Sequence, residues 1–428
     1  MIIKFLKKKI KFFLFTPFIF LIVFANAFKK IRFFKYDCEV MGAAEPIHTY
    51  LIEKDKKYLV FFYFTSFHTL KDLYKKNKNI FWLKILSREM CWIHLNNKFF
   101  FLLKNNIIFL FYKAVVVFKL KFFLINFNWI TRHTKDTPVN SKTRLAIQKI
   151  INSNLDPVIK LKKKEVDFCQ EKITPILKLN NEKREHVVFH NRDSAYKKIH
   201  SPNYDWSYHD YRNWDFDDYK KTLEYATKKY FTIRVGNIIE KSSKFKNKNF
   251  FEYANSNLVT DELDVYLIYS CKFYVGAGTG IDKVARLFNK PTLYINTFHP
   301  QVNPPRYLKK CIFLPTKLFD IKNNKLITFP QLFDKNFRKS KENFKPMGHY
   351  TSTTDYKNAG IKIIYNTPDD IFFAFQEMEK FIESKLEFDS LDIKLSKNFW
   401  KLFPEEAINT KDVIISPSFL RKNQELLA

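Results

Sequence analysis

Short apolar runs alternate with amphipathic stretches along the second half of this chain. Runs rich in Val, Ile, Phe and Tyr predict strands at residues 185–190, 230–235, 273–275 and 292–295. Apolar residues at helical spacing predict helices at 216–229, 265–270 and 281–287. Strands that alternate with helices are typical of an α/β fold whose parallel sheet is covered on both faces and binds ligands at its carboxyl edge.

The rest of the chain divides by the same patterns. We expect a first α/β domain at residues 33–175, in which Tyr58–Phe64 is a buried strand, and a second at 176–345. Residues 346–428 read as a strand and helix extension that closes the second domain. Thr367 and Pro368 predict the start of its long helix. The polar segment from Glu387 onward is expected to be peripheral.

Residues 1–32 carry an apolar run, Phe12–Phe28, between two groups of basic residues. Positive charge at both ends gives no preferred orientation across a membrane. We expect a helix that lies on the cytoplasmic face of the cytoplasmic membrane, held by phenylalanines and anionic lipid. A spanning anchor and a core helix are the alternatives.

Net charge changes this picture little. The formal charge is +31, but lysine is spread along the whole chain and no basic-aromatic motif for nucleic acid occurs, so nucleic acid is not an expected partner. Five widely spaced cysteines form neither a disulfide framework nor a zinc motif. The simplest compartment is therefore the reducing cytoplasm.

Glycine is rare, and three of the seven glycines fall in one turn, Gly276-Ala277-Gly278-Thr279-Gly280, between a predicted strand and helix. Backbone N–H groups at such a helix start favour a phosphate, which the missing Cβ atoms allow to approach. The spacing is not the dinucleotide fingerprint, and no Walker lysine follows. A nucleotide-sugar diphosphate fits better than NAD or ATP, and a plain tight turn is the alternative.

Arginine is also rare, and four of the twelve arginines fall within residues 184–234, just upstream of the glycine turn: Arg184, Arg192, Arg212 and Arg234. Guanidinium groups bind phosphate with two hydrogen bonds, so this cluster favours an anionic ligand. His190, Arg192, Asp193 and Ser194 stand together at the end of a predicted strand. Asp193 could be a base or could orient Arg192, and a structural Arg–Asp pair with a capping histidine is the alternative.

A second polar cluster contains His209, Asp210, Arg212 and Asn213. Aromatic residues that suit a sugar or a nucleobase surround it: Trp206, Tyr208, Tyr211 and Trp214. A loop packed by its own aromatic side chains is the alternative. Asp215-Phe216-Asp217 matches the D-x-D pattern of metal-bound nucleotide diphosphates, but it starts a predicted helix, where carboxylates act as caps. We therefore expect no required metal ion.

Together these motifs resemble a family of bacterial glycosyltransferases whose members are found with surface-polysaccharide and lipopolysaccharide genes. The resemblance covers residues 180–385 and rests on H-N-R-D-S-A-Y, H-D-Y-R-N, R-V-G, K-F-Y-V-G-A-G-T-G and N-T-P-D-D-I. His190-x-Arg192 is also similar to the H-x-R motif of fucosyltransferase-like enzymes, although the arginine and glycine that often follow it there are absent. The resemblance implies a GT-B fold, in which two Rossmann-like domains face a cleft.

The resemblance implies a transferase that moves a sugar from a nucleotide-sugar donor to a glycan or lipid-linked acceptor in cell-surface glycan synthesis. The candidate acid–base residues are Asp193, His209 and Asp210. The candidate donor-binding residues are His190, Arg192, Ser194, Arg212, Asn213, Arg234, Gly236, Gly276, Gly278, Thr279 and Gly280. An epimerase or hydrolase of the same shape, and a non-catalytic membrane-docked binding protein of a polysaccharide assembly complex, are the alternatives.

Overall fold

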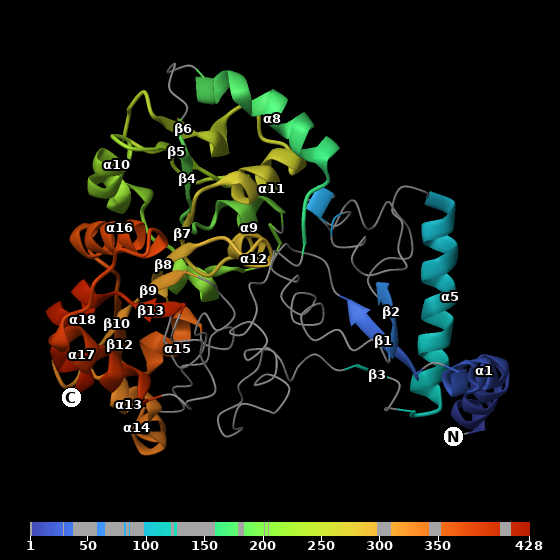
Figure 1. The fold of residues 1–428 in the computed structure, drawn as a ribbon. Helices are drawn as coiled ribbons and strands as arrows, with labels where there is room; N and C mark the ends of the chain where they lie inside the picture. Colours follow the sequence, from blue (N-terminus) through green and yellow to red (C-terminus); the bar gives the residue numbers. More distant parts are fainter. Residues whose placement is uncertain are drawn as a thin grey trace. The chain divides into compact units, whose positions relative to one another are not determined.

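The chain forms two compact units, Met1–Lys135 and Asp136–Ala428, in a computed structural model (Figure 1). The boundary that the sequence suggested, between residues 175 and 176, falls inside the helix α8 (Lys163–Lys178), which belongs to the second unit. The structure describes residues 2–28, 30–36, 58–64, 81–82, 85, 98–120, 124–125, 159–178, 184–200, 202–203, 205–297, 310–341, 352–402 and 412–428.

The first unit contains a parallel sheet in the order β2-β1-β3 and two long helices. Its described elements are α1 (Ile2–Phe28), β1 (Lys30–Tyr36), β2 (Tyr58–Phe64), α5 (Lys98–Val117) and β3 (Leu124–Ile125). The predicted strand 58–64 is confirmed as β2. One face of α1 packs on α5 through Ile22, which contacts a small core with Ile108 and Val115. No helix of the described ranges is both long and apolar enough to cross a membrane.

The second unit is built on a seven-stranded parallel sheet in the order β13-β9-β8-β7-β4-β5-β6. Its strands are β4 (His186–Phe189), β5 (Phe231–Arg234), β6 (Phe250–Glu252), β7 (Tyr274–Gly276), β8 (Thr292–Thr297), β9 (Cys311–Pro315) and β13 (Val413–Ile415). The chain starts at the centre with β4, adds β5 and β6 on one side, and then adds β7, β8 and β9 on the other. This is the strand order of the Rossmann fold, so the predicted parallel α/β sheet is confirmed for this unit.

Helices cover both faces of the large sheet (Figure 1). One layer holds α10 (Lys220–Ala226), α16 (Pro368–Ile382) and α18 (Pro417–Lys422), and the other holds α8, α11 (Asp261–Ser270) and α12 (Asp282–Leu287). The shorter helices are α9 (Ala195–His200), η3 (Ser207–Arg212), η4 (Phe216–Tyr219), η5 (Tyr253–Asn255), α13 (Phe329–Phe333), α14 (Lys335–Ser340), α15 (Thr353–Asn358) and η8 (Gln424–Leu427). Burial on both faces explains why the strands are nearly continuous apolar runs.

Helix α16 shows how the sequence fixes an element. The Thr367 side chain accepts the N–H of Asp370 in a capping box, and Pro368 occupies the first turn, as predicted. Phe375 on its buried face lies parallel to Phe189 of β4, with ring centroids 5.9 Å apart, and packs against Phe273. Removing such a buried phenylalanine typically costs about 3–5 kcal/mol of folding stability.

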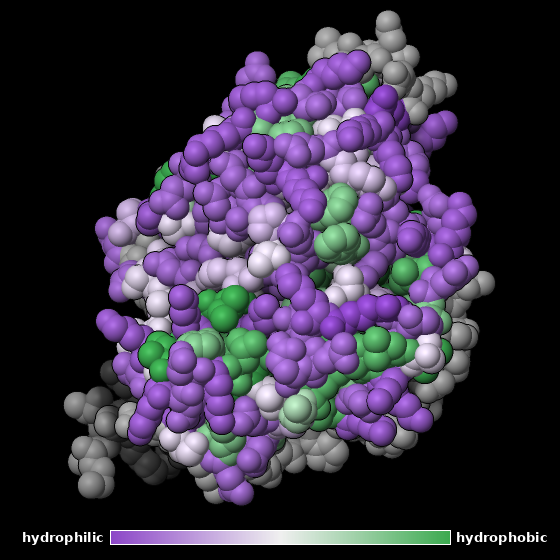
Figure 2. All heavy atoms as spheres, turned by 90° about the vertical axis from the view of Figure 1, so that its left-hand side faces the viewer, coloured by the Kyte–Doolittle hydropathy of each residue, from purple (hydrophilic) through white to green (hydrophobic). Residues whose placement is uncertain are grey.

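The C-terminal segment differs from its prediction as a peripheral extension. Residues 413–415 form β13, which pairs with β9 in the large sheet, and α17 (Ser390–Trp400) places Phe399 in the core. A second, antiparallel sheet contains β10 (Lys317–Asp320), β11 (Lys325–Ile327) and β12 (Ile361–Ile364) in the order β11-β10-β12. The tail is therefore part of the fold of the second unit. Figure 2 shows a mostly hydrophilic surface over this part of the chain, with small separate hydrophobic patches.

Candidate functional site

The candidate site lies between β4 and β7, where the order in which strands are added to the sheet reverses. These two strands pair directly, with Val188 opposite Tyr274 and Phe189 opposite Val275. The segment that starts at His190 therefore leaves the sheet beside the turn that follows Gly276. Ligands of open parallel sheets bind at such a switch point, outside the carboxyl ends of the strands. The fold thus brings together the two motifs that the sequence singled out.

Arg192 is held in this place by neutral acceptors. Its Nη1 donates to the carbonyl oxygen of His209 at 3.1 Å and to the side-chain oxygen of Asn213. Burial lowers the pKa of Arg192 to about 10, and repulsion from nearby Arg212 adds to this. Among the described residues, no carboxylate forms an ion pair with Arg192. A half-buried guanidinium beside a second one favours an anionic ligand.

Arg212 joins the second motif to the glycine turn. Its guanidinium donates to the carbonyl oxygen of Gly278, and its backbone lies at the end of η3. Thr353 of α15 holds η3 from outside, since its hydroxyl accepts the N–H of Tyr211 at 3.2 Å and donates to Ser207 at 2.8 Å. Sequence analysis missed Thr353, because nothing in the sequence indicates that a residue so far along the chain packs on this turn.

Asn213 links Arg192 to Asp210. While its oxygen accepts from Arg192, its Nδ2 donates to Asp210 Oδ1 at 2.9 Å. Asp210 itself is exposed. The hydroxyl of Tyr365, which the sequence did not single out, donates to the carbonyl oxygen of Tyr211 at 2.9 Å. Burial raises the pKa of Tyr365 to about 12, and the nearby Asp210 carboxylate acts in the same direction. Three predicted residues, Arg192, Asp210 and Asn213, thus form one connected group.

His190 is neutral at physiological pH. Burial lowers its pKa to about 3, and the charges of Arg234 and Arg192 act in the same direction. Its backbone is fixed on both sides, because its N–H donates to Val275 at 2.9 Å and its carbonyl accepts the Tyr219 hydroxyl at 3.0 Å. The ring Nδ1 is buried without a partner among the described residues. A neutral imidazole can form hydrogen bonds to a ligand, but it does not serve as a general acid at physiological pH.

Asp193 is not placed as the predicted base. Its Oδ1 accepts the N–H of Ala195 at 3.0 Å and its Oδ2 accepts the N–H of Glu240 at 2.9 Å, so both oxygens hold backbone. Neither the Arg192–Asp193 pair nor the alternative in which Asp193 orients Arg192 is seen. Ser194, predicted to bind the donor, donates to Glu240 Oε2 at 3.2 Å. Both residues fasten α9 to the following loop.

Arg234 also differs from its prediction as a phosphate ligand. It is 1% exposed, and its Nη1 forms an ion pair with Glu252 at 2.6 Å. The other contacts are the Lys241 carbonyl oxygen at 3.0 Å and the Asn191 side-chain oxygen at 3.1 Å, and the guanidinium lies 4.1 Å from the centroid of the Phe216 ring. These groups direct Arg234 into the protein. Gly236 follows with φ +149°, a backbone conformation that favours glycine.

The glycine turn is shaped by packing more than by an open helix start. A Cβ atom at Gly276 would lie 2.5 Å from the Tyr274 hydroxyl and 3.0 Å from the His190 carbonyl oxygen, which explains this glycine without a ligand. The N–H of Thr279 donates to Asp282 Oδ1 at 2.8 Å and is not available to a phosphate. Gly280 completes the turn before the six-residue helix α12.

Asp282, which the sequence did not single out, holds this turn by accepting the N–H of Thr279. Its carboxylate is 0% exposed and accepts the Tyr294 hydroxyl at 2.6 Å, with Arg286 Nε at 3.3 Å. Lys283 also faces this carboxylate at 3.6 Å, and the binding of a phosphate at this helix N-terminus stays a prediction.

The D-x-D carboxylates serve as caps and ion-pair partners. Asp215 accepts the N–H of Asp217 at 2.9 Å, and Lys241 lies 3.1 Å from Asp215 and 3.6 Å from Asp217. Within the described ranges, no group of three acidic, histidine or cysteine side chains is placed to hold a metal ion.

Aromatic rings border η3, as the sequence suggested. The rings of Tyr208 and His209 have centroids 4.0 Å apart, and Trp206 lies parallel to His209 at 6.5 Å. The ammonium group of Lys197 lies 4.1 Å above the Trp206 ring. His209 is thus fixed by its carbonyl contact to Arg192 and by ring stacking.

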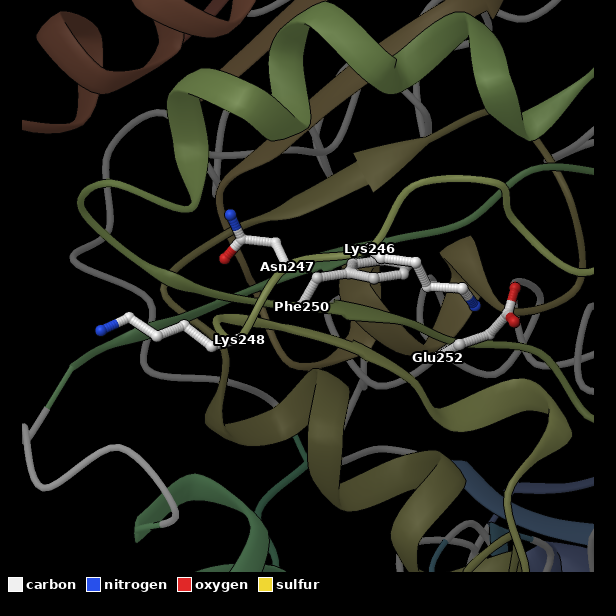
Figure 3. Close-up of a pocket in the computed structure, with 5 residues that line it drawn as sticks. All are labelled: Lys246, Asn247, Lys248, Phe250 and Glu252. Carbon is white, nitrogen blue, oxygen red and sulfur yellow. The ribbon is translucent and has the colours of Figure 1, made fainter.

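A cavity of about 480 Å³ is found elsewhere, at the edge strand β6 (Figure 3). Its lining consists of Lys246, Asn247, Lys248, Phe250 and Glu252. None of these residues belongs to the predicted site, and Glu252 is already paired with Arg234. The convergence of side chains between β4 and β7 is the better indication of function.

Comparisons with known proteins match this chain to solved structures. No protein-family model matches the chain, and no curated protein matches its sequence. The glycosyl transferase family 9 structure from Veillonella parvula DSM 2008 is 11% identical with a TM-score of 0.39, over 83% of this chain and 98% of that one. The E. coli ADP-heptose lps heptosyltransferase II structure is 13% identical with a TM-score of 0.34, over 66% and 90%. Because both TM-scores are below 0.5, neither similarity assigns an activity to this chain.

Proposed function

We propose that this protein is a glycosyltransferase that takes a sugar from a nucleotide-sugar donor and attaches it to a lipid-linked or polysaccharide acceptor in cell-surface glycan synthesis. One observation carries the proposal: Arg192 lies at the switch point of the sheet close to Arg212, and its own hydrogen bonds go to a carbonyl oxygen and an amide oxygen. The motif resemblance to bacterial glycosyltransferases supports the same function. Two adjacent guanidinium groups fit a diphosphate better than a single phosphate.

In this proposal the donor diphosphate binds between the His190 loop and the glycine turn. The bond between the sugar C1 and the diphosphate oxygen breaks, and the negative charge that develops on the leaving diphosphate is stabilised by Arg192 and Arg212. A new bond forms between C1 and the acceptor oxygen. The two guanidinium groups supply positive charge at the diphosphate, so no divalent ion is required. The neutral His190 lies beside them as a hydrogen-bonding group.

Asp210 is the better candidate for the base that takes the proton of the acceptor hydroxyl. It is exposed, and the Asn213 amide holds one of its oxygens. Asp193 is less suitable, because two backbone N–H groups occupy its carboxylate. His209 is proposed to position Arg192 through its carbonyl oxygen and to present its ring with Tyr208 to the substrate.

Besides the donor and the acceptor, the proposed partner is a membrane surface with anionic lipid, and the proposed location is the cytoplasmic face of the cytoplasmic membrane. Helix α1 packs on α5 with one face and exposes large apolar side chains on the other, where Phe13, Phe20 and Phe24 are 82%, 71% and 68% exposed. The sequence of residues 1–32 contains eight basic and no acidic residues. Apolar side chains with flanking positive charge fit an anionic lipid surface.

A thermal-shift screen tests the donor assignment. The chain is mixed with UDP, GDP, ADP, CMP and dTDP and with their common sugar conjugates, in the presence of EDTA. One base family is expected to raise the melting temperature, and the Arg192→Ala variant is expected to lose this shift. If no nucleotide raises it, the proposal is wrong. Consumption of the donor without any acceptor would instead favour an epimerase or hydrolase.

A further inference from the structure

Arg192 of the candidate site is held differently from three other arginines of this chain. Arg234, Arg286 and Arg421 each contact at least one carboxylate, at 2.6 Å, 3.3 Å and 2.6 Å respectively. Arg192 contacts a carbonyl oxygen and an amide oxygen instead. A carboxylate partner neutralises a guanidinium, whereas a neutral acceptor orients it and leaves its charge for a ligand.

The amide of Asn213 can point in only one direction. Its Nδ2 donates to Asp210 Oδ1 at 2.9 Å, and its backbone N–H donates to the Asp210 carbonyl at 2.9 Å. The side-chain oxygen therefore faces Arg192, because a flipped amide would place an NH₂ group against a guanidinium. The Asn213 side chain thus presents its oxygen to the Arg192 guanidinium and its NH₂ group to the Asp210 carboxylate.

We propose that Asn213 is a positioning residue that orients Arg192 toward the donor diphosphate without neutralising its charge, and that it holds Asp210 at the same time. This inference rests on the proposed function. It changes the role of Asn213 from a donor-binding residue, as the sequence suggested, to one that acts through Arg192 and Asp210.

The physical reason for an amide at this position is clear from its two neighbours. An aspartate at 213 would place a carboxylate on Arg192, forming a charge-assisted pair that competes with a phosphate. The same carboxylate would face Asp210, and two like charges at hydrogen-bond distance repel each other. Because Arg192 is half-buried, water screens both effects less than it would at the surface.

The test compares two substitutions of Asn213 that differ in charge. In Asn213→Asp the new ion pair with Arg192 is expected to offset the repulsion from the exposed Asp210 and to keep the melting temperature near that of wild type, while the dissociation constant for the nucleoside diphosphate rises about tenfold or more. In Asn213→Ala the melting temperature is expected to fall, because both side-chain hydrogen bonds are lost. The dissociation constant is expected to rise less, since Arg192 keeps its charge and the His209 carbonyl.

A matched control is available in Asn191, which contacts the buried Arg234. Its side-chain oxygen accepts from Arg234 at 3.1 Å and its Nδ2 donates to Trp214 at 3.0 Å. Because Glu252 already neutralises Arg234, Asn191→Asp is expected to leave diphosphate affinity within about twofold of wild type and to act on stability alone.

The measurements are titration calorimetry with pyrophosphate and with the tightest-binding nucleoside diphosphate, and thermal melting of each variant. The inference is supported if Asn213→Asp is the more stable variant but binds diphosphate more weakly than Asn213→Ala. Substitutions of a merely structural residue would lower affinity and stability together. Affinity that follows stability, or is unchanged in Asn213→Asp, overturns it while the proposed function stands. A wild-type chain that binds none of the probes overturns both.

Discussion

Two arginines that look alike in the sequence have different surroundings in the fold. Arg192 and Arg234 each stand at or just beyond the end of a predicted strand, and both were predicted to bind phosphate. The sequence could not distinguish them, because the Glu252 that neutralises Arg234 lies on a neighbouring strand whose pairing is not visible in the chain. The rarity of arginine singled out this group of residues, and the ion pair of Arg234 with Glu252 leaves Arg192 as the proposed phosphate ligand.

Replacing each arginine by alanine separates the two roles. Arg192→Ala is expected to weaken donor binding about tenfold or more, with a small change in stability. Arg234→Ala leaves Glu252 without its partner in the protein and is expected to cost about 3–5 kcal/mol of unfolding free energy. Titration calorimetry and urea denaturation measure the two effects. Equal losses of affinity and stability in both variants would contradict this division.

The pKa of His190 predicts a loss of stability in acid. Its folded-state pKa of about 3 lies below the 6.5 of an unfolded histidine, so the unfolded chain binds the proton more readily. The stabilisation is complete above pH 6.5 and falls as the pH drops toward 3, by at most about 1.4 kcal/mol per pH unit. His190→Asn is expected to flatten the slope of unfolding free energy against pH in this range. An unchanged slope would mean that His190 is not protected from protonation in the folded state.

At the scale of elements, the apolar pattern predicted most of the second unit. Strands β4, β5, β7 and β8 and helix α16 lie where the sequence placed them, because each is a run of one clear periodicity with a recognisable start or end. Elements that depend on distant partners were missed. No local pattern indicates that residues 413–415 complete the large sheet, or that β12 pairs antiparallel with β10.

The sequence singled out the glycine turn as a phosphate site, but in the structure close packing explains why Gly276 is a glycine. Gly276→Ala is expected to destabilise the second unit by about 1–3 kcal/mol, because the new methyl group meets the Tyr274 hydroxyl. Adding Tyr274→Phe removes the nearest atom and is expected to recover part of this loss. Urea denaturation of the single and double variants measures it. If alanine at 276 is tolerated without cost, the packing explanation is wrong.

For the whole molecule, the net charge of +31 did not indicate a ligand, whereas the group of arginines near the glycine turn indicated an anionic one. The predicted parallel sheet is confirmed in the second unit, and its strand order places the two motifs side by side. The predicted cleft between two domains, and the membrane role of residues 1–32, stay predictions. Motif order along the chain could indicate the sheet edge, but only side-chain contacts could assign Asp193, Arg234 and Asp282 to structural roles.

The exposed face of α1 predicts binding to anionic vesicles. Replacing Phe13, Phe20 and Phe24 together by serine is expected to abolish cosedimentation with phosphatidylglycerol-containing vesicles, since the face that packs on α5 is left intact. Phe373→Ser, which removes an exposed phenylalanine of α16, is the control and is expected to change nothing. Loss of binding in the control alone, or retention in the triple variant, would place the lipid contact elsewhere.

The most direct test of the central claim is sugar transfer by the intact chain. Radiolabelled donor, chosen from the binding screen, is incubated with membranes that contain lipid-linked acceptors, in EDTA. Label is expected to enter the lipid or glycan fraction with wild-type protein and to fall at least about a hundredfold with Arg192→Ala, Arg212→Ala combined. Transfer that is undiminished in this double variant, or no transfer by the wild-type chain to any membrane acceptor, would contradict the account.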